Sequence, residues 1–364
     1  MKLKILTMTV LTAAFFHYGN LLLAEWNGGN AQIIPASIYG DDDRQDVADS
    51  DAKMQALSSS AVALFLESSL STGAKTGSYS LPAGAGTLGS NRGMAPGQRF
   101  TDQVQGAYCS GALVGDDLIF TAGHCLKESI IGNFDCAKDK LVFGFAVTKK
   151  DGSAPTEFAK KDVYGCKQIV SWKLDAKTKT DYAVLKLDRK VEGRVPLAIN
   201  RGDDLKVGDK LFVIGYPDGL PIKVAGGAKV RSLPAGAPYF FTDLDTFHGN
   251  SGSPVFNAKT FRIEGILVRG DNDYVNTSSG TKTDIFPQEL GAGEEVTKIS
   301  EIKNLLPVTL FEKYLNYAEK EQRKPAPVAR PVPAIYFPGS NGPSVQPAVY
   351  YPEPAPTRVE AILI

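Results

Sequence analysis

Residues 247–256 read FHGNSGSPVF, in which a serine lies among small residues with a histidine three positions before it. A serine attacks a carbonyl when a base with a pKa near neutrality takes its proton and a carboxylate orients that base. Of the three histidines, His17 lies in a segment that we expect to be removed, which leaves His124 and His248. A tight turn would fix the side chains of His248 and Ser251 in directions that need not meet. We therefore interpret His248 as a residue that lines the cleft or supports the structure.

Two segments further upstream carry the other groups that such chemistry requires. LIFTAGHCL, residues 118–126, is a β-type run ending in small residues, from which His124 could project into a cleft. TDYAVLKL, residues 180–187, contains Asp181 and is typical of a loop that enters a strand. Each signal alone is weak, since a lone histidine is more often structural and an aspartate at such a place is more often a cap or turn residue. The hypothesis depends on the three segments together.

TAGHC, TDYAVLKL and GNSGSP, in this order, resemble the His, Asp and Ser segments of trypsin-like serine proteases. The resemblance covers about residues 98–300 and is closest to the bacterial branch that includes the glutamyl endopeptidases, through SIYGDDDRQDV, VIGYP and NSGSPVFN. It implies that His124 is the general base, Asp181 its orienting carboxylate and Ser251 the nucleophile of an endopeptidase acting on protein or peptide substrates through an acyl-enzyme. Neither a cofactor nor a metal is implied.

The same resemblance assigns the glycines and the cysteines. The main-chain N–H groups of Gly249 and Ser251 would form the oxyanion hole, and Gly252 would leave room beside the nucleophile. Four cysteines allow three pairings in principle. The resemblance pairs Cys109 with Cys125 beside His124, which leaves Cys136 to pair with Cys166. No CxxC or HxxxH spacing occurs, so a metal site is disfavoured.

Specificity and activation are less constrained by the sequence. Asp245 lies six residues before Ser251, where the resemblance to trypsin implies a carboxylate that selects Arg or Lys before the cut, with Leu267 and Gly270 in the pocket wall. Arg269, in GILVRGD near the expected pocket wall, could also neutralise Asp245. The residue before the nucleophile is Asn250, which cannot bind an N-terminal ammonium as an ion pair. Either no such switch exists, or a processed terminus near residues 33–38 packs near the site through neutral hydrogen bonds.

The hydrophobic pattern predicts an all-β fold. Many short β-branched runs separated by Gly, Pro, Asp and Asn indicate antiparallel strands. The resemblance implies two six-stranded barrels, about residues 98–195 and 205–300, in a peptidase domain spanning 98–310. Helical spacing appears in EEVTKISEIKNLL, residues 294–306, expected to pack on the second barrel, and in TLFEKYLNYAEKEQRK, which follows it.

The two ends of the chain differ in composition from this domain. The basic MKLK followed by apolar residues is typical of a signal peptide, residues 1–24, and predicts a secreted or periplasmic protein without stable membrane insertion. Residues 25–97 are expected to form an N-terminal arm with a Gly/Ser-rich insert, residues 25–36 being a candidate pro-segment of a zymogen. Residues 325–364 form a Pro-rich tail that we expect to be disordered.

Net charge and the expected fold class argue against some other functions. Lys and Arg number 40, as do Asp and Glu, so a nucleic-acid partner is disfavoured. An esterase with the same three groups would need an α/β context, which the β-rich pattern opposes. A protease-fold protein whose main task is to bind another protein through the Pro-rich tail stays open as the alternative to an active endopeptidase.

Overall fold

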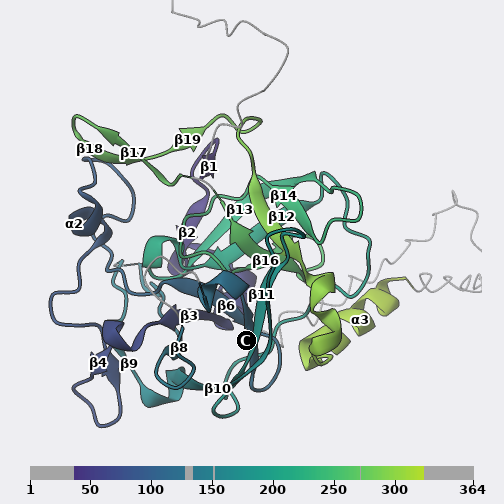
Figure 1. Ribbon diagram of the computed structural model, residues 1–364, viewed down its shortest axis with the longest axis horizontal. Helices are drawn as coiled ribbons and strands as arrows, with labels where there is room; N and C mark the ends of the chain where they lie inside the picture. The colour runs from purple at the N-terminus through teal and green to yellow at the C-terminus, as the bar shows by residue number, and fades with distance from the viewer. Residues whose placement is uncertain (1–36, 128–133, 151, 271, 324–364) are drawn as a thin grey trace, which may run out of the picture. The chain divides into compact units, whose positions relative to one another are not determined.

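A computed structural model describes residues 37–127, 134–150, 152–270 and 272–323 (Figure 1). All of these residues belong to the same compact unit of the chain. The predicted signal peptide, the candidate pro-segment and the Pro-rich tail lie outside the described residues. Among the residues that are described, no helix is both long and apolar enough to cross a membrane.

Six antiparallel strands close into a first barrel. Their order around the barrel is β10-β11-β7-β6-β3-β8, with β10 also pairing with β8. The strands are β3 (Ala61–Phe65), β6 (Cys109–Leu113), β7 (Leu118–Thr121), β8 (Lys140–Phe143), β10 (Val163–Leu174) and β11 (Asp181–Leu187). The barrel begins well before residue 98, the boundary expected from the sequence, because the apolar run AVALF of the N-terminal arm supplies β3 between β6 and β8.

A second ring of six antiparallel strands follows, in the order β12-β15-β16-β20-β14-β13, and closes through the pairing of β12 with β13. These strands are β12 (Lys210–Gly215), β13 (Lys223–Ser232), β14 (Tyr239–Thr242), β15 (Pro254–Asn257), β16 (Ile263–Arg269) and β20 (Glu294–Lys298). A seventh strand from the N-terminal arm, β2 (Arg44–Asp46), adds to the outer edge of β13. The two expected six-stranded barrels are therefore confirmed.

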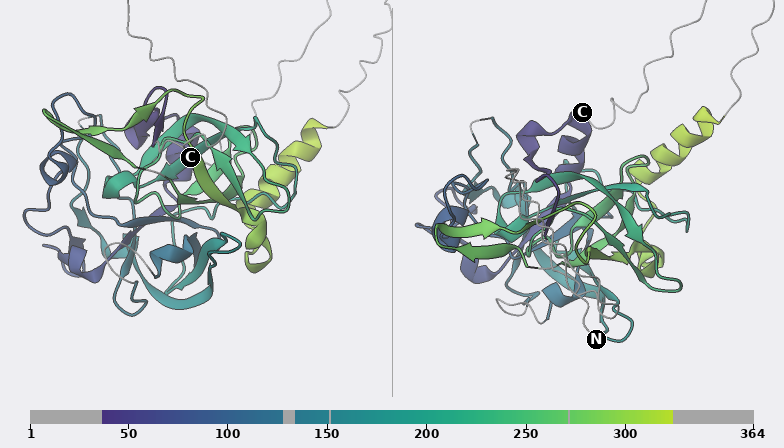
Figure 2. Two further views of the ribbon diagram at one scale, coloured as in Figure 1. Left: turned by 45° about the horizontal axis from the view of Figure 1, so that its top comes forward. Right: turned by 90° about the horizontal axis from the view of Figure 1, so that it is seen from above.

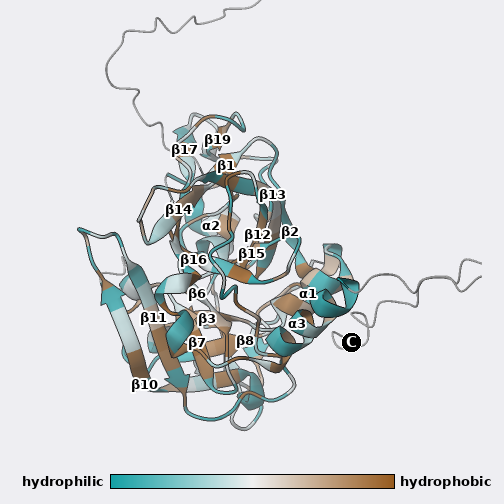
Figure 3. Cartoon of the chain, turned by 90° about the vertical axis from the view of Figure 1, so that its right-hand side faces the viewer, coloured by the Kyte–Doolittle hydropathy of each residue, from teal (hydrophilic) through white to brown (hydrophobic). Residues whose placement is uncertain are grey.

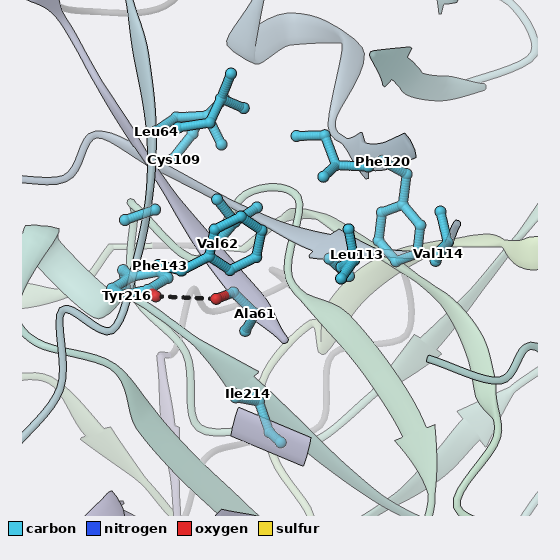
Figure 4. Close-up of a cluster of buried hydrophobic side chains, with 14 of the residues drawn as sticks. Ala61, Val62, Leu64, Cys109, Leu113, Val114, Phe120, Phe143, Ile214 and Tyr216 are labelled. Atoms are coloured by element: carbon cyan, nitrogen blue, oxygen red, sulfur yellow. Dashed lines mark hydrogen bonds between the residues drawn. The ribbon is translucent and has the colours of Figure 1, made fainter. Parts of the chain in front are cut away.

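One buried hydrophobic cluster extends across both barrels, and a second, smaller cluster lies within the second barrel. Buried side chains of both barrels form a continuous cluster, and the strands that carry them are the most hydrophobic parts of Figure 3. Tyr216, which follows β12, lies against β3 and donates its hydroxyl to Ala61 O at 3.3 Å (Figure 4). Burial raises the pKa of Tyr216 far above its ordinary value, so this hydroxyl stays a donor. This hydrogen bond fixes the loop after β12 relative to the first barrel.

Residues 294–306 are not a helix, which corrects the expectation from their apolar spacing. They form β20 and two short 3-10 turns, η6 (Ile299–Glu301) and η7 (Lys303–Leu305). The second barrel cannot close without a strand between β14 and β16, and these pairings override the local helical preference. The later helical segment is confirmed as α3 (Leu310–Gln322), which is capped by the Thr309 side chain (Figure 2).

Short elements complete the described structure. They are β1 (Ile38–Tyr39), α1 (Ala52–Ser58), β4 (Ser71–Thr72), β5 (Tyr79–Ser80), α2 (Leu88–Arg92), β9 (Glu157–Phe158), β17 (Tyr274–Thr277), β18 (Gly280–Thr283) and β19 (Ile285–Phe286). Five of them come from the N-terminal arm, which also supplies β3 to the first barrel and β2 to the edge of the second, so the arm is more than an appendage.

Candidate active site

His124 and Asp181 are brought together at one end of the first barrel. His124 lies in a 3-10 turn, η3 (Gly123–Cys125), directly after β7, and Asp181 is the first residue of β11. The Asp181 carboxylate accepts the His124 main-chain N–H at 3.0 Å with one oxygen and lies 2.8 Å from His124 Nδ1 with the other. A carboxylate on Nδ1 fixes the tautomer in which Nδ1 carries hydrogen and Nε2 is free to accept a proton. Asp181 is 1% exposed, so water does not compete for this carboxylate.

The loop that carries Ser251 is tied to the first barrel through Ser110 on β6. Ser110 donates its main-chain N–H to Ser251 O at 2.8 Å and its hydroxyl to Gly249 O at 2.7 Å. The same hydroxyl accepts the N–H of Tyr216 at 3.0 Å. The buried Ser110, which the sequence analysis did not single out, therefore connects the Ser251 loop with β6, the strand that pairs with β7. A small polar residue beside Cys109 is too weak a signal to be found in the sequence.

Two glycines of this loop have conformations and surroundings that exclude a side chain. Gly249 has φ +88°, and a Cβ atom there would lie 2.6 Å from Tyr216 O. Gly252 has φ +90°, and its Cβ would lie 2.0 Å from Ser110 O. Both contacts are too close for any other residue, and the positive φ adds strain. The contacts of Gly252 are with Ser110 and Thr121 of the first barrel, and its expected role beside the nucleophile stays a prediction.

A cavity of about 460 Å³ lies where the segments meet. His124, Gly249 and Ser251 line it together with Tyr108, Arg92 and His248. Within the described part of the chain, no hydrogen bond joins Ser251 Oγ to the His124 ring. Such bonds are often long in the absence of substrate and shorten when substrate binds. The arrangement places a hydroxyl, a ring with a fixed tautomer and a glycine loop around one accessible space.

Both expected disulfides are present, Cys109–Cys125 and Cys136–Cys166. Cys109, Cys125 and His124 lie close enough together to suggest a metal site, but the two sulfur atoms are bonded to each other. A disulfide offers no thiolate to a metal. This cluster is therefore a covalent brace next to His124.

Comparison with known proteins identifies the domain. Residues 109–266 match the model of the family described as Trypsin-like peptidase domain. The chain contains a trypsin-like peptidase domain. The match begins with β6 and ends within β16, so it takes in the His124, Asp181 and Ser251 segments.

Relatives of the peptidase domain carry consistent names. A probable periplasmic serine endoprotease DegP-like from Halomonas elongata is 39% identical over 110 residues, which are 29% of this chain and 22% of that protein. A protein of the same name from Ectopseudomonas mendocina is 37% identical over 112 residues, again 29% and 22%. This chain thus spans about a fifth of the length of these relatives. The structure of Vibrio cholerae VesB protease aligns at 15% identity with a TM-score of 0.45 over 72% of this chain and 66% of that one. The resemblance to glutamyl endopeptidases stays a prediction.

The peptidase domain does not bring the predicted specificity residues into the cavity. Asp245, Leu267 and Gly270 are not among the lining residues. Asp245 is 2% exposed, and its carboxylate accepts the main-chain N–H groups of Tyr39 at 2.9 Å and Asp43 at 2.7 Å. Burial raises the pKa of Asp245 to about 7, although these two donors act in the opposite direction. Asp245 is therefore hydrogen-bonded to the N-terminal arm and does not face the cavity.

Arg269 lies beside Asp181 rather than beside Asp245. Its Nη2 is 3.2 Å from Asp181 Oδ2, the oxygen that faces the His124 ring, and its Nη1 pairs with Glu295. The sequence suggested that Arg269 could neutralise Asp245, and this is wrong because Arg269, the last residue of β16, pairs with Asp181 at the start of β11. The carboxylate that orients His124 therefore has a second, cationic partner from the second barrel.

His248 has a richer environment than sequence reasoning assigned. Its Nδ1 pairs with Asp273 and its Nε2 with Asp218, and its main-chain N–H donates to Asp273 at 3.0 Å. Burial alone would lower the pKa of His248, but the hydrogen bonds with the two carboxylates outweigh it and raise the pKa to about 9. Nothing in the local sequence marks either aspartate, because both lie more than 20 residues away along the chain.

Proposed function

We propose that this chain is a serine endopeptidase that hydrolyses peptide bonds through an acyl-enzyme, with Ser251 as nucleophile, His124 as general base and Asp181 as orienting carboxylate. The observation that carries the proposal is the double contact of Asp181 with His124 beside the cavity that Ser251 also lines. The names of the relatives, serine endoproteases, agree with it.

The first chemical step uses the tautomer that Asp181 favours. Ser251 Oγ attacks the carbonyl carbon of the scissile peptide while His124 Nε2 takes the hydroxyl proton. The resulting imidazolium is stabilised by Asp181 and gives its proton to the leaving amine, which breaks the C–N bond and leaves an ester on Ser251. Water, activated by the same ring, then hydrolyses this ester and restores the free serine.

The negative oxygen of each tetrahedral intermediate needs donors that are already in place. The main-chain N–H groups of Gly249 and Ser251 are the candidates, since both residues line the cavity. Ser110 donates hydrogen bonds to the main-chain carbonyl groups of the same two residues. These bonds leave the two N–H groups free of Ser110 and fix the direction of the loop. Donors held by the fold do not have to reorganise during the reaction, and this is where their contribution to the rate arises.

A location outside the cytoplasm is supported by the relatives and by the disulfides. The relatives named above are described as periplasmic, and the two disulfides suit an oxidising compartment. We therefore propose a periplasmic or secreted location.

A pair of serine variants tests the proposed function. Ser251→Ala should abolish both hydrolysis of a casein or peptide-library substrate and labelling by a fluorophosphonate probe, because the attacking atom is removed. Ser279→Ala, an exposed serine in the turn between β17 and β18, should change neither. Labelling that survives in the Ser251 variant would refute the assignment, and a wild-type protein that is neither labelled nor active would refute the function.

A further inference from the structure

His248 lies at the centre of a group of charged and polar side chains that we call the His248 cluster: Arg92, Asp218, His248, Asp273 and Tyr274. They come from α2, from the turn η5 (Pro217–Gly219), from the Ser251 loop and from the start of β17. Asp218 accepts from Arg92 Nε at 2.9 Å and Nη2 at 2.5 Å and from the Tyr274 hydroxyl at 2.7 Å. The cluster adjoins the cavity through Arg92, Asp218 and His248.

The His248 ring bridges two carboxylates that belong to different parts of the second barrel. A neutral imidazole can donate through only one nitrogen, and an imidazolium donates through both. Two carboxylates facing Nδ1 and Nε2 therefore favour the protonated ring. The side chain is 44% exposed, but this exposure is on the cavity side and the two nitrogens face the aspartates.

The bridge is next to the atoms that would bind the oxyanion. His248 immediately precedes Gly249, and its own carbonyl accepts the main-chain N–H of Asp218 at 2.6 Å. Gly249 packs so closely on the same turn that a Cβ would lie 3.1 Å from Asp218 N. Ring and main chain of His248 thus both attach the Gly249 segment to η5. A shift of η5 or of Asp273 would move the Gly249 N–H.

Further groups contact the His248 ring or the two carboxylates that flank it. From α2, Arg92 Nη2 lies 2.6 Å from His248 Nε2, and Asp218 Oδ1 contacts both nitrogens. From the N-terminal arm, the Ser37 hydroxyl donates to Asp273 at 2.9 Å. Burial would raise the pKa of Asp218, but its hydrogen bonds with His248 and Arg92 lower it to about 2. Two cations face two anions, so loss of one charge leaves the cluster unbalanced.

We propose that His248 is a positioning residue of the proposed peptidase: as an imidazolium held between Asp218 and Asp273, it fixes the segment that presents the Gly249 N–H to the oxyanion. The inference rests on the proposed function and adds to it. Asn250 offers no charge to this loop, and the ion pairs of His248 supply the electrostatic attachment one residue earlier than Gly249.

The proposal predicts a specific pH dependence. The pKa of His248 is raised from 6.5 to about 9. The attachment is therefore complete below about pH 6.5 and is lost as the pH rises through about 9. The general base must be neutral, so its titration shapes only the acidic side of the profile. We therefore expect an alkaline decline of kcat centred near pH 9.

Steady-state kinetics of His248→Gln and His248→Arg, from pH 6 to 10.5 on a peptide substrate, test the proposal. Gln cannot carry the charge, so kcat at pH 7.5 should fall at least tenfold with KM changed less than threefold, because the oxyanion contact acts mainly in the transition state. Arg stays charged, so it should restore at least part of kcat and abolish the decline near pH 9. Equal kcat in wild type and the Gln variant, or an unchanged alkaline limb in the Arg variant, would overturn the proposal.

Two controls separate this result from other failures. Fluorophosphonate labelling of the wild type reports whether the proposed function holds at all, before any His248 variant is interpreted. Arg201→Gln removes a different ion pair, with the buried Glu312 at 2.6 Å on α3, far from the Ser251 loop in sequence. It should lower the melting temperature and leave kcat unchanged. If kcat falls as much in this variant as in His248→Gln at matched loss of stability, His248 has only a structural role.

Discussion

The main-chain N–H of Tyr39 donates to the carboxylate of Asp245 at 2.9 Å, across 206 positions of the sequence. The other oxygen of Asp245 accepts from Asp43, and Thr246 donates its N–H to Ser37 O at 3.1 Å. The loop that leads to Ser251 is therefore attached to the N-terminal arm at residues 245 and 246. Asp245 serves this attachment, in a place where the resemblance to trypsin implied a substrate-binding carboxylate.

The titration of Asp245 should make stability pH-dependent. Its native pKa, about 7, lies above the ordinary 3.8, so its contribution to the free energy of unfolding is fully present below about pH 4 and is lost as the pH rises through 7. At about 1.4 kcal/mol per pH unit, the loss is on the order of 4 kcal/mol. Urea unfolding of wild type and Asp245→Asn at pH 4 and pH 8 measures it: the stability difference, wild type minus variant, should fall with pH.

A peptide-library digest with the same variant provides the accompanying control. Asp245→Asn should leave the preferred residue before the cut unchanged, since Asp245 does not line the cavity. Loss of a preference for Arg or Lys in this digest would restore the specificity role that the sequence suggested. A stability difference that is constant with pH would show that Asp245 does not titrate in this range.

Arg269 should support the Asp181 carboxylate that contacts His124. Its guanidinium lies 3.2 Å from Asp181 Oδ2, the oxygen that faces the His124 ring. In Arg269→Gln this carboxylate loses its cationic partner, so kcat/KM at pH 7.5 should fall, by less than about tenfold because Arg269 is 37% exposed. Arg262→Gln, which removes an ion pair with Glu319 on α3, is the matched control and should leave kcat/KM unchanged. An unchanged kcat/KM in Arg269→Gln contradicts this role.

Gly249 should be intolerant of a side chain. Alanine there would meet Tyr216 O at 2.6 Å in a backbone with φ +88°, so the loop must shift and its N–H with it. Loss of one oxyanion donor typically lowers kcat by about 10²- to 10³-fold, and we expect a fall of that size in Gly249→Ala. Gly226→Ala is the control, because a Cβ there has no atom within 4 Å. Comparable kcat in Gly249→Ala and wild type would exclude the glycine N–H as a donor.

The two disulfides should differ in their effect on catalysis. Replacing either pair with alanines should lower the free energy of unfolding by about 3 kcal/mol, given loops of 16 and 30 residues. Only the Cys109–Cys125 bond adjoins His124, so only its removal should also lower kcat. Denaturant unfolding and kinetics of both double variants measure the two effects. Equal kcat in the two would show that the brace does not position His124.

Short local patterns were enough to predict much of this protein. The Ser251, His124 and Asp181 segments each combine one reactive group with its characteristic small or β-branched neighbours, and the structure brings His124 to Asp181. Both disulfides and the two barrels follow the same resemblance. The all-β prediction succeeds because strand alternation and turn residues are visible in adjacent positions of the sequence, whereas the disulfide pairing and the number of barrels depended on the resemblance to a known family.

The tertiary structure decided the rest. It placed AVALF of the N-terminal arm in the first barrel and made residues 294–298 a strand, since a barrel closes only when every edge is paired. It also determined the partners of the charged groups. Asp245 accepts from Tyr39 and Asp43, Arg269 pairs with Asp181, and His248 pairs with two aspartates. Buried charges must find partners wherever the folded chain brings them, and contacts across tens to hundreds of residues leave no local mark in the sequence.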